Sequence, residues 1–216
     1  MGCGTGAMSR LLRQHYQHAE VVAADLALGM VRKACEQPAT PGKPLGVCTD
    51  AARLPFQTRG FDLLLSNLML QWCNDLPAVF GEFARVLKPD ALLSFSTFGP
   101  ATLREMRASW REVDGFPHVS RFLGTDDLEN ALRRAGFHSL DVRVETMIIR
   151  YAEVGSLLRE LKGIGAANTA IDRHHGLTGK GRMQRFLKAY ETHRLADGGY
   201  PATYEAIYVH ALAPAG

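Results

Sequence analysis

Short apolar runs alternate with amphipathic stretches along the first hundred residues of this chain. Continuous apolar runs bounded by turn residues predict buried strands, whereas apolar positions recurring every three or four residues predict helices that bury one face. We expect strands at residues 20–26, 45–49, 60–67 and 91–98, and helices at residues 6–17, 28–37 and 76–87. This alternation predicts βαβ units and a mostly parallel sheet.

The pattern changes after residue 100, where amphipathic stretches outnumber apolar runs. We expect helices at residues 101–113, 125–135, 152–162 and 179–195, and strands at residues 142–149 and 203–211. The first hundred residues are therefore interpreted as a ligand-binding half, and residues 101–216 as a substrate-side half with helices inserted around the last two strands. Because 216 residues is the length of one domain, we expect a single α/β domain over residues 1–216.

Composition and charge exclude several classes of protein. With 46% hydrophobic and 22% charged residues, the chain has enough apolar side chains for a globular core. No apolar run approaches the roughly 18 residues of a membrane helix, and the N-terminus has no apolar signal core, so we expect a cytoplasmic protein without membrane contact. The net charge of +3 is too balanced to indicate a nucleic-acid partner. The four cysteines lack zinc-site spacing, so we expect no metal.

The first candidate for chemistry is the glycine-rich segment GCGTG at residues 2–6. Closely spaced glycines let a ligand approach the backbone, and the helix start that follows offers free N–H groups, although such a turn can be purely structural. Asp25 ends the next predicted strand, 19 residues after Gly6 (25 − 6 = 19). An acid there suits the ribose hydroxyls of an adenosine ligand, or the N-cap of a helix. These two features favour NAD and S-adenosylmethionine equally.

An ordered set of motifs in the first hundred residues separates these two ligands. After GCGTG and Asp25 come TDAARLPF, which contains Asp50, then GFDLLLSN, which ends in Ser66 and Asn67, and then ARVLKPDALLSFS. In this order they resemble the class I S-adenosylmethionine-dependent methyltransferases. LKPDALL is similar to the LKPGG turn of that family, with Asp90 and Ala91 in place of glycines.

The resemblance implies a fold, a cofactor and a set of binding residues. The fold is a doubly wound, Rossmann-like sheet that is mostly parallel with an antiparallel last strand, and the cofactor is S-adenosylmethionine. The glycines would pack against its methionine moiety, and Asp25 would hold the ribose. Asp50 with Ala51 would face the adenine, and Asn67 would lie near the methyl-bearing sulfur. The full set of implied cofactor-binding residues is Gly2, Cys3, Gly4, Gly6, Asp25, Leu26, Asp50, Ala51 and Asn67.

Longer sequence blocks in the second half point to one family within this class. FSTFGPATLREMRASWREVDGFPHVSRF, LLRELKGIGAANT, HHGLTGKGRM and GGYPATYEAIY are similar to segments of the malonyl-acyl-carrier-protein O-methyltransferase family of biotin biosynthesis. That family methylates the free carboxylate of a malonyl thioester, so the resemblance implies an S-adenosylmethionine-dependent carboxyl O-methyltransferase. The candidates for binding the substrate or forming the wall of its pocket are His118, Arg121, Lys162, Asn168, Tyr151 and Trp72.

The chemistry of this reaction limits what the protein must supply. A carboxylic acid has an ordinary pKa near about 4, so the acceptor is ionised at neutral pH and needs no general base. The protein must instead align the reacting atoms and exclude water. A carboxylate that is held too tightly in the ground state would lose reactivity. We therefore expect one or two polar contacts to the acceptor and no catalytic residue in the narrow sense.

Basic residues gather between positions 159 and 188. Seven of them stand there against Glu160 and Asp172, a local balance of +5 (7 − 2 = 5). They are Arg159, Lys162, Arg173, Lys180, Arg182, Arg185 and Lys188. Because acyl carrier proteins are acidic, this basic face would steer a malonyl-acyl carrier protein partner. A solvated helix face, or a surface for a phosphate backbone, is the alternative.

The chain departs from the family at its start. In the family an apolar strand inside the sheet comes directly before the glycine loop, with a helix before it, whereas this chain begins at Met1. Either the natural protein extends upstream, or the sheet lacks an interior strand and leaves unpaired edges. In the second case we expect poor folding and weak cofactor binding.

Three other functions stay open at this point. One is a methyltransferase of the same class that acts on another small acid or a quinone precursor. Another is a non-catalytic cofactor-binding protein. The third is an NAD-dependent dehydrogenase, which depends on the glycine loop alone and is disfavoured by Asp50 and the segment SNLMLQW.

Overall fold

A computed structural model describes residues 1–36, 44–163 and 179–216, and the chain divides into two compact units. The first unit comprises Met1–Thr97, Thr125–Arg143 and Ile207–Gly216. The second unit comprises Phe98–Gly124 and Val144–Ala206. The last two strands each contribute residues to both units. None of the helices within the described ranges is long and apolar enough to cross a bilayer.

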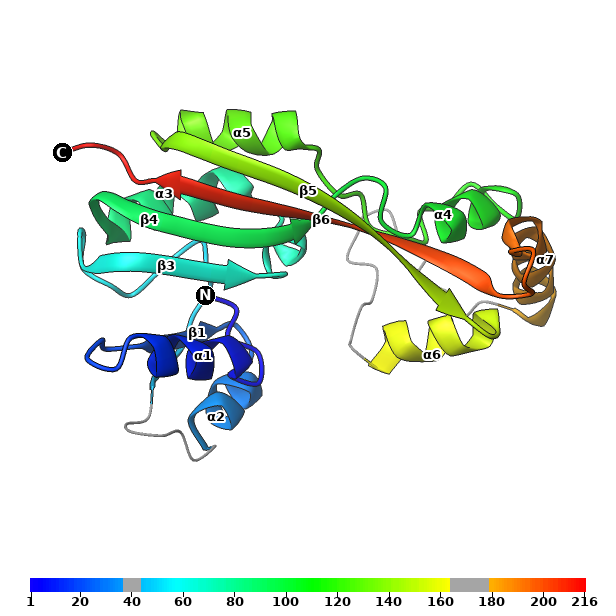
Figure 1. Cartoon of the computed structure of the whole chain (residues 1–216), viewed down its shortest axis with the longest axis horizontal. Helices are drawn as coiled ribbons and strands as arrows, with labels where there is room; N and C mark the ends of the chain where they lie inside the picture. The colour runs from blue at the N-terminus through cyan, green and yellow to red at the C-terminus, as the bar shows by residue number, and fades with distance from the viewer. Residues whose placement is uncertain (37–43, 164–178) are drawn as a thin grey trace. The chain divides into compact units, whose positions relative to one another are not determined.

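The first unit begins with the predicted alternation of strands and helices (Figure 1). Its elements are α1 (Ala7–His15), β1 (Val22–Asp25), α2 (Leu28–Glu36), β2 (Leu45–Cys48), β3 (Phe61–Asn67), the short 3-10 helix η1 (Leu70–Trp72), α3 (Leu76–Val86), β4 (Leu87–Phe98) and α5 (Thr125–Arg134). Every strand and helix predicted in the first hundred residues is present, and most boundaries differ by one or two residues. The 3-10 helix was not predicted, because three residues are too few for a periodic pattern.

The strands form two sheets. β1 and β2 pair in parallel, in a register that runs from Val22 opposite Leu45 to Asp25 opposite Cys48. The other sheet has the order β3-β4-β6-β5, in which β3 and β4 are parallel. Figure 1 shows β6 (Tyr200–Leu212) running opposite to its neighbours β4 and β5 (His138–Tyr151). The prediction of mostly parallel strands with an antiparallel last strand is therefore confirmed.

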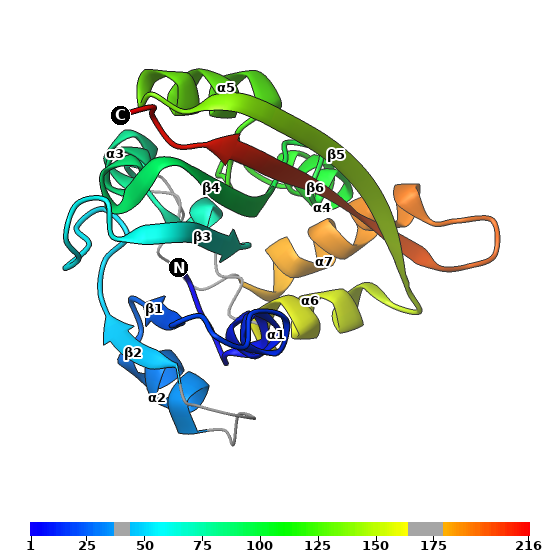
Figure 2. The same cartoon turned by 60° about the vertical axis from the view of Figure 1, so that its left-hand side comes forward.

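The start of the chain lies between β3 and β1 (Figure 2). The Met1 amine donates a hydrogen bond to the Leu65 carbonyl of β3, at 2.6 Å, and the Cys3 N–H donates to the Ala24 carbonyl of β1, at 2.9 Å. No ladder joins β1 to β3 among the described residues, so one continuous sheet, as expected for this fold, is replaced by two.

The junction between α3 and β4 differs most from the predicted boundaries. The strand begins at Leu87, directly after the helix, rather than at residue 91. Pro89 is tolerated because it lies near the beginning of the strand, where a missing N–H costs little. Asp90 has a φ of +54°, the left-handed region that glycine adopts most readily. This conformation explains why the related turns have glycine there, and aspartate is among the residues that tolerate it.

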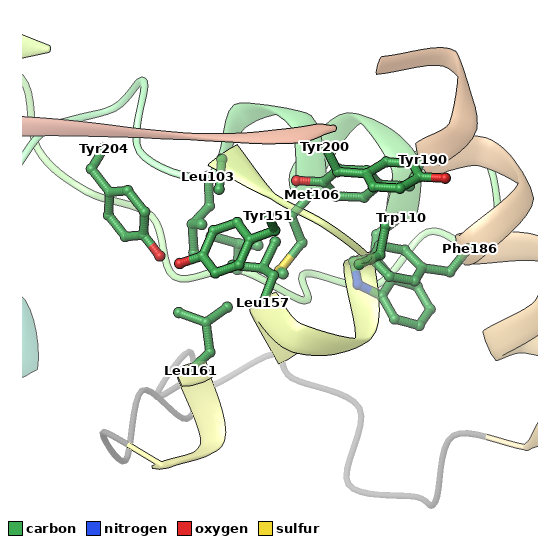
Figure 3. Close-up of a cluster of buried hydrophobic side chains, with 13 residues drawn as sticks. Leu103, Met106, Trp110, Tyr151, Leu157, Leu161, Phe186, Tyr190, Tyr200 and Tyr204 are labelled. Carbon is green, nitrogen blue, oxygen red and sulfur yellow. The ribbon is translucent and has the colours of Figure 1, made fainter. Parts of the chain in front are cut away.

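The second unit contains the predicted helical insertions. They are α4 (Arg104–Arg111), α6 (Val154–Gly163), α7 (Lys180–Tyr190) and the 3-10 helix η2 (Glu191–His193). The helix α4 begins three residues later than predicted. Leu103, which precedes it, has a left-handed φ of +54°, so the helix cannot extend further toward the N-terminus. Figure 3 shows the core of this unit, where Trp110 of α4 stacks on Phe186 of α7 with ring centroids 4.3 Å apart.

Candidate functional site

The glycine loop is tied to β1 through the carboxylate of Asp25. Its Oδ2 accepts a hydrogen bond from the Gly4 N–H and its Oδ1 accepts one from the Ala27 N–H, both at 2.9 Å. The second bond satisfies a backbone donor in the turn that leads into α2. Since each carboxylate oxygen has a further lone pair, Asp25 keeps acceptor capacity for a ligand hydroxyl while it orders the loop.

Gly4 and Gly6 have different reasons to be glycine. Both adopt left-handed conformations, with φ of +50° and +84°. A Cβ on Gly6 would lie 2.8 Å from the Ala34 Cα, so this position is required for α1 to pack on α2. A Cβ on Gly4 would meet no atom within 4 Å. The open space beside Gly4 is therefore where a ligand can approach the backbone, and this loop fits the methionine end of S-adenosylmethionine.

The other predicted adenosine contacts follow the ends of β1 and β2. Leu26 is 70% exposed directly after Asp25, and Asp50 is exposed two residues after β2. The Asp50 Oδ1 accepts a hydrogen bond from the Ala52 N–H at 2.9 Å, while Ala51 is buried. In open α/β sheets, ligands bind beyond the carboxyl ends of parallel strands. An exposed leucine and two carboxylates that follow the ends of these strands fit a ligand with an apolar base and a hydroxylated sugar.

Glu82 and Arg85 of α3 hold the segment that follows Asp50, and the sequence interpretation missed both. The Arg85 guanidinium forms a bidentate pair with Glu82, at 2.7 and 2.8 Å, and donates to the carbonyls of Phe56 and Leu54. Glu82 also accepts from the Leu54 N–H at 2.7 Å. The hydrogen bond from Arg85 holds the pKa of Glu82 below its ordinary value. The only signal in the sequence was an acid and a base three residues apart on one helix.

The carboxyl end of β3 leads from Asn67 into a residue that packs on the glycine loop. A Cβ on Gly2 would lie 2.5 Å from the Cγ of Met69, which is two residues after Asn67. The Asn67 side chain is exposed, and its Oδ1 accepts a hydrogen bond from the Ser96 hydroxyl at 2.6 Å. All the predicted cofactor-binding residues thus belong to the first unit.

Two thiols near this loop are held in the protonated form. Burial, with a smaller contribution from the Asp25 carboxylate, raises the pKa of Cys3 to about 11. Burial, followed by the Asp50 carboxylate, raises the pKa of Cys73 to about 11. Thiols of this kind are poor nucleophiles at neutral pH. The site around the glycine loop therefore offers oxygen acceptors and backbone donors rather than a reactive thiolate.

The predicted substrate-binding residues are spread over both units. Trp72 is 41% exposed in the first unit. In the second unit, the His118 Nε2–H donates to the Asp114 Oδ1 at 2.8 Å, and the His118 ring stacks on Trp110 with centroids 3.7 Å apart. Tyr151 is buried in the core of Figure 3, a placement that serves packing.

The three remaining candidates differ in what the structure says of them. Arg121 and Lys162 are exposed residues of the second unit. Asn168 lies outside the described residues, as do Arg173 and Asp172 of the predicted basic face. The described part of that face includes Lys180, Arg185 and Lys188, which are exposed on α7.

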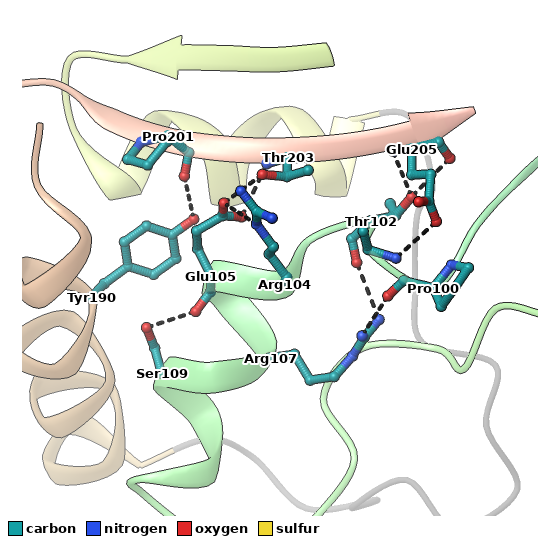
Figure 4. A network of polar contacts seen from close by, with 11 residues as sticks. Pro100, Thr102, Arg104, Glu105, Arg107, Ser109, Tyr190, Pro201, Thr203 and Glu205 are labelled. Carbon is teal, nitrogen blue, oxygen red and sulfur yellow. Dashed lines mark hydrogen bonds and ion pairs between the residues drawn. The ribbon is translucent and has the colours of Figure 1, made fainter. Parts of the chain in front are cut away.

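A buried carboxylate in the second unit was also missed (Figure 4). Glu105 of α4 accepts hydrogen bonds from both the hydroxyl and the N–H of Thr203 on β6, the latter at 3.0 Å. Arg104 donates to the same carboxylate at 3.2 Å. Burial alone would raise the pKa of Glu105, but the hydrogen bonds from Thr203 outweigh it and leave the pKa below its ordinary value. Glu105 therefore fastens α4 to β6 as a carboxylate.

Comparisons with known proteins agree on a family. The family described as a methyltransferase domain matches residues 1–95. A malonyl-[acyl-carrier protein] O-methyltransferase of Methylovorus sp. is 44% identical over 219 residues, which cover 99% of this chain and 74% of that protein. The biotin biosynthesis bifunctional protein BioHC of Saccharophagus degradans is 41% identical, over 98% of this chain and 39% of that protein.

Solved structures agree on the fold. The YcgJ protein of Bacillus subtilis is similar with a TM-score of 0.69 at 18% identity, covering 100% of this chain and 90% of that one. At this identity the likeness concerns the fold alone.

Proposed function

Because the chain belongs to the malonyl-[acyl-carrier protein] O-methyltransferase family, we propose that it methylates the free carboxylate of a malonyl thioester on acyl carrier protein, in the synthesis of biotin. The chain is an S-adenosylmethionine-dependent O-methyltransferase. Membership of the family is the observation that carries the choice of acceptor. Membership of this family also disfavours the alternatives, which were another small acid or a quinone precursor as acceptor, and an NAD-dependent dehydrogenase.

The cofactor is assigned to the first unit. The Gly2–Gly6 loop and Cys3 would hold its methionine moiety, Asp25 with Leu26 its ribose, and Asp50 with Ala51 its adenine. This proposal is supported by the open space beside Gly4 and by the free lone pairs of the Asp25 carboxylate. When bound, S-adenosylmethionine supplies a methyl carbon whose bond to a sulfonium sulfur breaks as a carboxylate oxygen bonds to that carbon.

The residues of this chain position the acceptor and do not transfer a proton. The acceptor is already ionised at neutral pH, and its methyl ester carries no charge, so no proton has to be removed or delivered. Orientation of a bound acceptor can supply several kcal/mol of the barrier reduction. We propose that substrate contacts include members of the set His118, Arg121, Lys162, Asn168, Tyr151 and Trp72. Of these, His118 is fixed by Asp114 and Trp110, so its ring orientation is set.

The basic face is proposed to bind the carrier protein. Its described residues on α7 present Lys180, Arg185 and Lys188 to solvent. Surface charges of this kind accelerate association with an acidic partner and lose their effect as salt is added. Reversing the charge at Arg185 and Lys188 should raise the KM for malonyl-acyl carrier protein and leave the KM for malonyl-coenzyme A unchanged. The matched control is Lys33→Glu on α2, an exposed lysine of the first unit.

The test of the proposed acceptor compares thioesters that differ only in the free carboxylate. Transfer of a radiolabelled methyl group from S-adenosylmethionine is measured with malonyl-acyl carrier protein and with acetyl-acyl carrier protein. We expect transfer to the malonyl carrier, none to the acetyl carrier, and a label that alkaline hydrolysis releases as methanol. Label on the acetyl carrier, or label that resists hydrolysis, would contradict a carboxyl ester as the product.

A further inference from the structure

Ser96 fixes the direction of the Asn67 side chain. The two residues lie opposite each other in the parallel β3–β4 register. The Ser96 hydroxyl is buried and accepts a hydrogen bond from the Leu68 N–H at 3.2 Å. Its single proton is therefore free to be donated to the Asn67 carboxamide, 2.6 Å away. This distance is typical of O–H···O and shorter than most N–H···O bonds, so the carboxamide oxygen is the atom that faces Ser96.

This orientation turns the amide nitrogen of Asn67 away from Ser96. An amide nitrogen carries two N–H donors, and Asn67 makes no hydrogen bond through its nitrogen within the described residues. The Asn67 side chain is exposed at the carboxyl end of β3. Two donors of fixed direction therefore stand at the sheet edge where ligands bind in open α/β folds.

The backbone around Asn67 is held as firmly as its side chain. Leu68 adopts a left-handed φ of +49°, and its N–H also donates to the Ser96 carbonyl at 3.0 Å. The Leu68 carbonyl accepts from the Gln71 amide at 2.6 Å. Met69, one residue further, packs on Gly2 of the glycine loop. The direction of the Asn67 donors is thus set relative to the loop assigned to the cofactor.

We infer that the Asn67 amide donates a hydrogen bond to the oxygen of the acceptor carboxylate that does not take the methyl group, and that Ser96 is the positioning residue that aims this donor. The inference rests on the proposed function and adds a residue-level account of its acceptor site. A neutral donor suits this task, because it orients a carboxylate without the strong ground-state stabilisation that a lysine or arginine would give. The hydrogen bond persists in the product, since the ester carbonyl also accepts.

The experiment measures kcat and KM for malonyl-acyl carrier protein at saturating S-adenosylmethionine, together with the Kd of the cofactor. Ser96→Ala is expected to lower kcat/KM for the acceptor about tenfold, the cost of one oriented hydrogen bond, and to leave the cofactor Kd within about twofold. Asn67→Ala should lower kcat/KM at least as much. In the double variant the Ser96 change should have no further effect, because the group that it aims is gone. Ser94→Ala, two residues away on the same strand, is the matched control. Its kcat/KM and its cofactor Kd should equal those of the wild type.

Each outcome decides the inference. A wild-type rate for Ser96→Ala, or additive losses in the double variant, would overturn it while the proposed function stands. If Ser96→Ala does not fold, as judged by its unfolding midpoint, Asn67→Asp takes its place. That change keeps the oxygen that accepts from Ser96 and removes both donors, so it should lose at least tenfold in kcat/KM, and wild-type activity would overturn the inference. An inactive wild-type chain would instead count against the proposed function, and the inference would fall with it.

Discussion

Replacement of Asp25 by alanine removes a carboxylate that is expected to serve the cofactor and the loop at once. In the folded chain it accepts the Gly4 and Ala27 N–H groups, both at 2.9 Å. A hydrogen bond to a charged group contributes about 1.5 to 3 kcal/mol, and half-buried positions lie at the lower end of that range. The loss of the turn into α2 should cost about 1 kcal/mol of unfolding free energy, as for other capping residues. The ribose contact is lost in addition.

The expected result is a weaker cofactor complex in a chain that still folds. Affinity should fall by about 1 to 3 kcal/mol, which corresponds to a roughly 5- to 150-fold rise in the Kd of S-adenosylmethionine. Isothermal titration calorimetry gives the Kd, and urea unfolding gives the stability of the free chain. Asp25→Asn should have a Kd between those of the wild type and Asp25→Ala. It keeps one oxygen acceptor but places an N–H donor against either Gly4 or the ribose.

Asp62→Ala is the matched control for this prediction. Asp62 also lies in the first unit, but its side chain is 80% exposed and pairs with Lys88 at the surface. Surface ion pairs contribute about 0 to 1 kcal/mol, so neither affinity nor stability should change by more than that. A Kd for Asp25→Ala within twofold of the wild type would refute the assigned role of this carboxylate. A similar rise in both variants would show that the effect is not specific to the loop.

Three further predictions follow from contacts elsewhere. Gly6→Ala should lower the free energy of unfolding by about 2 to 4 kcal/mol, because its Cβ would overlap Ala34. Gly4→Ala should lower the free energy of unfolding by only about 1 to 2 kcal/mol, and its main effect in calorimetry should be weaker cofactor binding. Arg85→Met should destabilise the chain by about 1 to 2 kcal/mol in urea and expose residues 54–56 to faster hydrogen exchange. Glu105 has a folded-state pKa below its ordinary value of 4.5, so it stabilises the fold fully above that pH and less as the pH falls. The free energy of unfolding of Glu105→Gln should therefore decrease less on acidification than that of the wild type.

The elements of the fold were largely predictable from the apolar pattern. The run at residues 91–98 is largely buried and the run at residues 60–67 is partly buried, and burial leaves a local apolar signal in the sequence. The start of β4 was not predictable in this way. Lys88, Pro89 and Asp90 look like a turn, and they extend a strand only because Leu87 pairs with Phe61 of β3.

The cofactor residues were named from motifs, but their contacts depend on register and on the third dimension. The bond from Gly4 to Asp25 spans 21 residues, and its existence follows from the place of an acid at the end of the next strand. The pair of Asn67 and Ser96 depends on the alignment of β3 with β4, which no local pattern encodes. The same holds for Glu105 and Thr203, which are 98 residues apart. Tyr151, named as a pocket wall, lies in the buried core of the second unit, and its surroundings likewise depend on the tertiary fold.

This chain is proposed to place a methyl group on the free carboxylate of a malonyl thioester. Intact-mass spectrometry of malonyl-acyl carrier protein, after incubation with this chain and S-adenosylmethionine, tests it most directly. We expect a gain of one methyl group on the malonyl form and none on acetyl-acyl carrier protein in the same mixture. A malonyl carrier of unchanged mass at full cofactor saturation, or an equal gain on the acetyl carrier, would contradict it.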